Sequence, residues 1–151
     1  MRWARAQLAE LAPVEDELAE PGDAGRRQLL DRYAAAFERA DQAALLQLLT
    51  DDVVVEMPPY LTWLDGRDAF ARFLLARRSA VPDPWRMLPT RANGQPALAA
   101  YLRGDDGAHH AHSIQVFTVT RSGVSRLVAF LDPALFATFG LPPTVAARPR
   151  R

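Results

Sequence analysis

Three histidines, His109, His110 and His112, lie close together in a stretch whose alternating pattern predicts a β-strand. An imidazole titrates near neutral pH, so a histidine beside apolar neighbours in a cavity could take or give a proton. Strict alternation puts His112 on one strand face with Ile114, and His109 on the other with Gln115. If the face of His112 is concave, we expect this residue to be the acid or base. The alternative is a histidine satisfied on the sheet or facing solvent.

Asp132 and Tyr101 are the other two candidates for catalysis. Asp132 ends a predicted strand and directly precedes a proline, so its carboxylate could assist His112 at a pocket mouth. It could equally accept N–H groups as the cap of the following helix. Tyr101 alternates with small alanines, which leave room for a ligand whose oxygen the hydroxyl would orient; alternatively, the ring fills the space above them.

Candidate walls of a binding pocket are Tyr60, Trp63 and Trp85, because flat aromatic rings suit an apolar ligand. Packing in the core, or a gate loop, is the alternative. Glu56 follows three valines, and alternation puts it on the face opposite Met57. We expect Glu56 at an outer face or rim, unless a bulge resets the register and turns it into the pocket.

The segment TRANGQPA displays hydrogen-bond donors around a predicted turn. Asn93 and Gly94 both tolerate positive φ, so the pair demands a turn or a bulge. Arg91, Asn93 and Gln95 would then bind an anionic or carbonyl-bearing ligand, or dock a partner. A purely structural turn explains them as well.

Composition excludes several classes of function. The 151 residues include no cysteine and no lysine, so thiolate metal sites, cysteine nucleophiles and Schiff-base lysines are ruled out. A net charge of zero argues against nucleic-acid binding, and no apolar run reaches the ~18–20 residues that span a bilayer. No third ligand is spaced to complete a metal site with the histidines, and no cofactor motif is present. We therefore predict a cytoplasmic protein without metal, cofactor or membrane contact.

Periodicity predicts the elements that must position these side chains. Apolar spacings of three and four predict a helix over 26–40, a second helix capped by Asp41 in which Leu49 faces inward, and a third over 67–78. Alternating and β-branched runs predict strands at DDVVVE and over 85–89, 97–103, 109–120 and 124–131. A short last helix follows Asp132 and ends at Gly140.

This order predicts an α+β fold: a curved, antiparallel-rich sheet wrapped on three helices, cone-shaped, with an internal pocket. We expect three parts: an N-terminal helix and acidic linker over 1–24, a domain over 25–141, and a flexible tail over 142–151.

The run LLDRYAAAFERADQAALLQLLTDDVVVEMPP resembles the SnoaL-like branch of the nuclear transport factor 2-like superfamily over about 26–140. WRMLPTRANGQPALAAYLR, HSIQVFTV and VAFLDPALFATFGLPP resemble the C-terminal SnoaL-like domain of actinobacterial extracytoplasmic-function sigma factors, and RAQLAELAP resembles the link after their sigma region four. Sigma regions two and four themselves are not found, so we expect either an excised domain or a stand-alone relative.

The resemblance implies two functions. Some SnoaL-like proteins are cyclases, isomerases or epoxide hydrolases, so this chain would be a cofactor-independent acid–base enzyme for an apolar, oxygenated, polyketide-like metabolite. Others only bind ligands or partners, so it would sense a small effector or contact a sigma-factor core or RNA polymerase. The outer sheet face of the fold often pairs, which leaves a homodimer open. In ketosteroid isomerase-like relatives an aspartate precedes the proline that closes the first strand; Met57 stands there instead, so that mechanism is not carried over.

Overall fold

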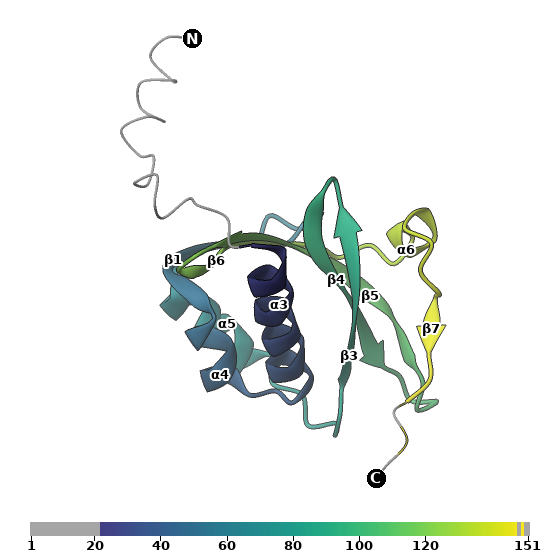
Figure 1. Ribbon diagram of the computed structural model, residues 1–151. Coiled ribbons are helices and arrows are strands. Elements are labelled where there is room, and N and C mark those ends of the chain that lie inside the picture. The colour runs from purple at the N-terminus through teal and green to yellow at the C-terminus, as the bar shows by residue number, and fades with distance from the viewer. Residues whose placement is uncertain (1–21, 148, 150–151) are drawn as a thin grey trace.

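A computed structural model of the chain describes residues 22–147 and residue 149 (Figure 1). The helix and most of the acidic linker predicted near the N-terminus lie outside the described residues. Among those described, the helices are α3 (Asp23–Glu38), α4 (Gln42–Gln47), α5 (Arg67–Ala76) and the short α6 (Leu135–Thr138). They match the predicted helices to within three residues at most ends, because each carries an apolar stripe that must be buried.

Seven strands form one sheet: β1 (Leu49–Glu56), β2 (Trp63–Asp65), β3 (Trp85–Ala92), β4 (Gln95–Arg103), β5 (His109–Thr120), β6 (Gly123–Phe130) and β7 (Thr144–Val145). The order is β2-β1-β6-β5-β4-β3. Only the β1–β6 pair is parallel among these described strands. Strand β7 pairs with the start of β5, where β6 no longer runs beside it. The predicted α+β fold with a curved, antiparallel-rich sheet is confirmed.

The helices α3, α4 and α5 lie on one side of the curved sheet, and α6 lies on the other (Figure 1). The main core forms between the first three helices and the sheet, with Tyr33 of α3 and Phe117 of β5 fully buried and their rings 4.7 Å apart. A second apolar cluster covers the opposite face of β4 and β5, where Phe136 of α6 packs on Tyr101. The two faces of β5 therefore meet different partners, which decides what each of its side chains can do.

Local chemistry at two turns follows the sequence. Asp41 accepts a hydrogen bond from the N–H of Ala44 at 3.1 Å, which confirms it as the cap of α4. Asn93 and Gly94 adopt φ of 52° and 77° in the hairpin between β3 and β4, as the pair predicted.

Three segments differ from expectation. Leu49 begins β1 rather than lying in a helix, because the carbonyl of Leu48 accepts the N–H of Val124 and starts the pairing with β6. The short strand β2 was not predicted, because its sequence has no alternation of apolar residues; it pairs with the end of β1. The expected tail contains β7, and Pro142 and Pro143 accept hydrogen bonds from the sheet.

No helix within the described part of the chain is both long and apolar enough to cross a membrane.

Candidate functional site

A cavity of about 260 Å³ lies between the helices and the sheet. We call it the central cavity. Its wall combines residues from α3, α5 and five strands or strand ends, so no single segment of the sequence outlines it. The lining residues are Tyr33, Phe37, Met57, Phe70, Phe73, Leu74, Arg77, Trp85, Leu102, His112, Ser113, Gln115, Leu127, Ala129 and Leu131. Most of this wall is apolar, as in typical small-molecule sites.

His112 reaches the central cavity because of a β-bulge. Ala100 of β4 pairs with Ser113, whereas the next residue, Tyr101, pairs with Ala111, so His112 is the extra residue between them. Consecutive strand residues normally point to opposite faces, but His112 and Ser113 both line the cavity. Strict alternation was therefore wrong here: the face that His112 was predicted to share with Ile114 is the outer one, and Ile114 packs in the second cluster.

The imidazole of His112 is held at two points. Its Nδ1 lies 3.1 Å from the Ser113 hydroxyl oxygen, and its ring meets the indole of Trp85 edge to face at 4.9 Å between centroids. Burial lowers the pKa of His112 below its ordinary value, so the ring is neutral at neutral pH. The other nitrogen, Nε2, has no hydrogen-bond partner among the described residues. A neutral imidazole with a free ring nitrogen can bind a ligand oxygen or move a proton.

Gln115 and Tyr33 form the second polar group of the cavity. The Tyr33 hydroxyl donates to Oε1 of Gln115 at 3.1 Å, and burial raises the pKa of this tyrosine well above its usual range. The Tyr33 bond fixes the Gln115 side chain, whose Nε2 has no partner within residues 22–147. That nitrogen can donate to a ligand oxygen. The sequence analysis did not select these two residues, although an amide between two apolar strand residues was a usable signal.

Glu56 is the last residue of β1, and Met57 follows it on the opposite face. Met57 lines the central cavity, while Glu56 accepts two hydrogen bonds of 2.9 Å from Nη2 of Arg126. The predicted outer position of Glu56 therefore holds, and no bulge turns it inward.

Asp132 and Tyr101 do not join His112. Asp132 is exposed, and its Oδ1 accepts the N–H of Ala134 at 3.0 Å in the turn that leads to α6. Tyr101 is fully buried on the outer face, where its hydroxyl donates to the Pro142 carbonyl at 3.0 Å. Tyr101 thus takes the structural role given above as its alternative. Asp132 accepts a backbone N–H in the turn, but it is not the cap of the helix, because the N-cap of α6 is Ala134 and no side chain caps that helix.

The other two histidines also lie away from the cavity. His109 is buried, with Nε2 3.0 Å from the carbonyl oxygen of Asp83. His110 is exposed and pairs with the carboxylate of Asp106 at 2.9 Å in the β4–β5 hairpin.

Trp85 is the only predicted binding residue that lines the central cavity in the described part of the chain. Tyr60 and Trp63 are 65% and 63% exposed around β2. Arg91 and Asn93 are exposed at the β3–β4 hairpin. Gln95, at the same hairpin, donates to the Thr118 hydroxyl at 3.3 Å.

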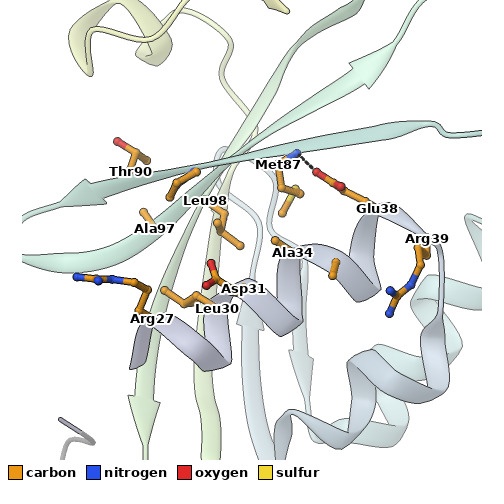
Figure 2. A pocket seen from close by; sticks show the side chains of 12 residues that line it. Arg27, Leu30, Asp31, Ala34, Glu38, Arg39, Met87, Thr90, Ala97 and Leu98 are labelled. Atoms are coloured by element: carbon orange, nitrogen blue, oxygen red, sulfur yellow. Dashed lines mark hydrogen bonds between the residues drawn. The ribbon is translucent and has the colours of Figure 1, made fainter. Parts of the chain in front are cut away.

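A second hollow, about 350 Å³, lies between α3 and strands β3 and β4 (Figure 2). Charged side chains form part of its lining, among them Arg27 and Asp31 of α3 and Arg39, which follows that helix. Figure 2 shows Glu38 reaching from α3 to the edge strand, where it accepts the Met87 N–H at 2.8 Å. This contact occupies one open donor of the sheet edge, and the hollow contains none of the predicted site residues.

Two solved structures share the fold. An LEH-like epoxide hydrolase from Mycobacterium tuberculosis is 16% identical, with a TM-score of 0.55 over 79% of this chain and 92% of that one. SalBIII, an epoxide hydrolase/cyclase-like enzyme of pyran ring formation in salinomycin, is 17% identical, with a TM-score of 0.57 over 74% and 93%.

The sequence is also similar to a curated protein, the ECF RNA polymerase sigma factor SigG of Mycobacterium tuberculosis. The two are 39% identical over 144 residues, which are 94% of this chain and 39% of that protein. The chain thus spans about two fifths of the length of this relative. Residues 30–131 match the family model of the SnoaL-like domain. With the fold described above, this match shows that the chain belongs to the SnoaL-like domain family.

Proposed function

We propose that this chain is a ligand-binding domain that takes a small, apolar, oxygen-bearing molecule into the central cavity and serves regulation rather than catalysis. The observation that carries the proposal is the pair of polar groups on β5. His112 and Gln115 each offer a nitrogen without a protein partner in the described chain, in a wall that is otherwise mainly apolar. Such a wall favours an apolar body, and the two nitrogens would fix its oxygen.

The composition of the wall favours binding over proton transfer. Within residues 22–147, no aspartate or glutamate lines the central cavity. Asp132, the predicted counterpart of His112, is exposed and bonded to a backbone N–H. Acid–base chemistry on a neutral substrate normally needs a second group to give or receive the proton, and a tyrosine with a strongly raised pKa is a poor one at neutral pH.

A regulatory role is supported by the relative of highest identity described above. The sigma factor is 39% identical, whereas the two enzyme structures are 16% and 17% identical. We propose that the chain contacts a sigma-factor core or RNA polymerase, and that occupancy of the cavity changes this contact. Association as a homodimer would use sheet surface that α6 and residues 141–145 leave open.

Ligand binding is tested with a panel of small apolar ketones, read by the fluorescence of Trp85 and by amide chemical shifts. Replacing Gln115 by Leu or His112 by Phe should weaken binding roughly twofold to tenfold, the range of one neutral hydrogen bond. Gln95→Leu, on the surface hairpin, is the matched control and should bind as the unchanged chain does. Equal binding by all four proteins would contradict the proposal.

A second candidate function is a cofactor-independent enzyme with His112 as its single base, acting on a polyketide-like metabolite. The lowered pKa of His112 supports it, since the neutral ring is the form that accepts a proton at neutral pH. In this candidate a bound water, rather than Asp132, exchanges the proton. Hydrolysis or cyclisation of an epoxide panel should then fall at least a hundredfold in His112→Ala, the usual contribution of such a group being roughly 10²–10⁴. Equal turnover by Asp132→Asn and the unchanged chain is expected, and unchanged turnover in His112→Ala excludes this enzyme.

A further inference from the structure

Arg77 is a cation at the central cavity with no carboxylate of its own. It follows the last residue of α5, is exposed and also lines the cavity, so it marks a point where the cavity opens to solvent. Its guanidinium carbon lies 3.8 Å from the ring centroid of Phe73, another lining residue. No Asp or Glu in the described part of the chain forms an ion pair with it.

The stacking on Phe73 orders the guanidinium before any ligand arrives. A planar guanidinium held against a ring keeps its forked N–H groups free at the edge, which suits a carboxylate that accepts two parallel hydrogen bonds. Less side-chain freedom is then lost when the ligand binds.

The surroundings of Arg77 keep the local charge positive. A neighbouring small depression shares Phe37, Leu74, Trp85 and Arg77 itself with the central cavity, and its lining also contains Arg78 and Asp41. Asp41, the cap of α4, is the single carboxylate in this lining, so the two arginines leave the local charge positive.

We infer that the ligand of the central cavity is an acid: an apolar body with a carboxylate that Arg77 binds at the opening. The inference rests on the proposed ligand binding and adds the chemical class of the ligand. The size of the cavity sets the scale, since 260 Å³ is just below the roughly 300–1,000 Å³ of sites for drug-sized molecules. A single ring with a short acid chain matches this volume.

The test compares benzoate, phenylacetate and phenylpropanoate with their primary amides, which have nearly the same shape and no charge. Dissociation constants are measured by calorimetry and amide chemical shifts for the unchanged chain, Arg77→Gln, Arg77→Lys, Arg78→Gln and Gln115→Leu. Each acid that binds should do so roughly fivefold to tenfold more tightly than its amide, as one partly exposed charged pair allows. Arg77→Gln should abolish this preference, so that each acid and its amide bind alike, while Arg77→Lys keeps part of it.

Arg78→Gln is the matched control, because Arg78 lines only the neighbouring depression, and it should keep the full preference. Equal affinities for acids and amides, or a preference that survives Arg77→Gln, would overturn the assignment of Arg77. If amides bind, lose affinity in Gln115→Leu and are not surpassed by acids, then only this inference fails. If neither series binds at millimolar concentration but the ketones do, only this inference fails; if the ketones do not bind either, the ligand-binding proposal fails with it. Thermal unfolding of each variant shows whether the fold is intact.

Discussion

The indole of Trp85 meets the imidazole of His112 edge to face, with ring centroids 4.9 Å apart and ring planes at 81°. One ring comes from edge strand β3 and the other from the bulge in β5, and both line the central cavity. The fluorescence of Trp85 can therefore report the protonation state of His112, the titratable group on which both proposed functions depend.

Protonation of His112 should quench the fluorescence of Trp85. Because burial lowers the pKa of His112, the midpoint of a pH titration should lie below the ordinary histidine value of about 6.5. The measurement uses a chain in which Trp3 and Trp63 are phenylalanine. The transition should vanish in His112→Gln and persist in His110→Gln, since His110 pairs with Asp106 in the hairpin. A transition that survives the first substitution would remove His112 as its source.

The same shift makes stability depend on pH. The folded chain binds a proton at His112 less readily than the unfolded chain, so the free energy of unfolding should fall as pH falls below about 6.5 towards the lower folded-state pKa. Above that window His112 contributes no pH dependence. Urea unfolding at a series of pH values should show a smaller decrease for His112→Gln than for the unchanged chain. An identical decrease in both proteins would mean that other groups cause it.

Gly123→Ala should destabilise the chain strongly. Gly123 adopts φ of 130°, and an added Cβ would come 2.5 Å from the backbone oxygen of Leu48, where β1 begins. Gly94 at φ of 77° has nothing within 4 Å, so Gly94→Ala isolates the backbone strain alone. We expect about 1–3 kcal/mol for Gly94→Ala and a larger loss for Gly123→Ala, measured by urea unfolding. Equal losses would show that the strand junction relaxes around the methyl group.

Tyr101→Phe should cost stability and leave ligand binding intact. The change removes the hydrogen bond to Pro142, worth about 0.5–1.5 kcal/mol, from the outer face of the sheet. Tyr60→Phe, at an exposed position, should change stability by less than about 0.5 kcal/mol. If the Tyr101→Phe protein is fully folded and still binds ketones more weakly, then the outer face of the sheet does influence binding in the central cavity.

Much of the fold could be predicted from local patterns. The stripe of α3, the cap at Asp41 and the turn at Asn93 depend on residues near one another in the chain, so their physics is readable in sequence. Alternation also correctly predicted that Glu56 and Met57 lie on opposite faces, because the pairing of β1 with β2 is regular at that end.

The site depended on contacts between distant segments. A bulge forms between two strands, so alternation along β5 alone could not show that His112 turns to the face of Gln115. Tyr101 was equally ambiguous, since only the packing of Phe136 and the acceptor at Pro142 make its face the outer one. The sequence by itself determined the family, the elements and the presence of polar groups in β5. Tertiary structure alone decided which of those groups meet in a cavity, because that choice depends on strand pairing and on the segments that cover each face.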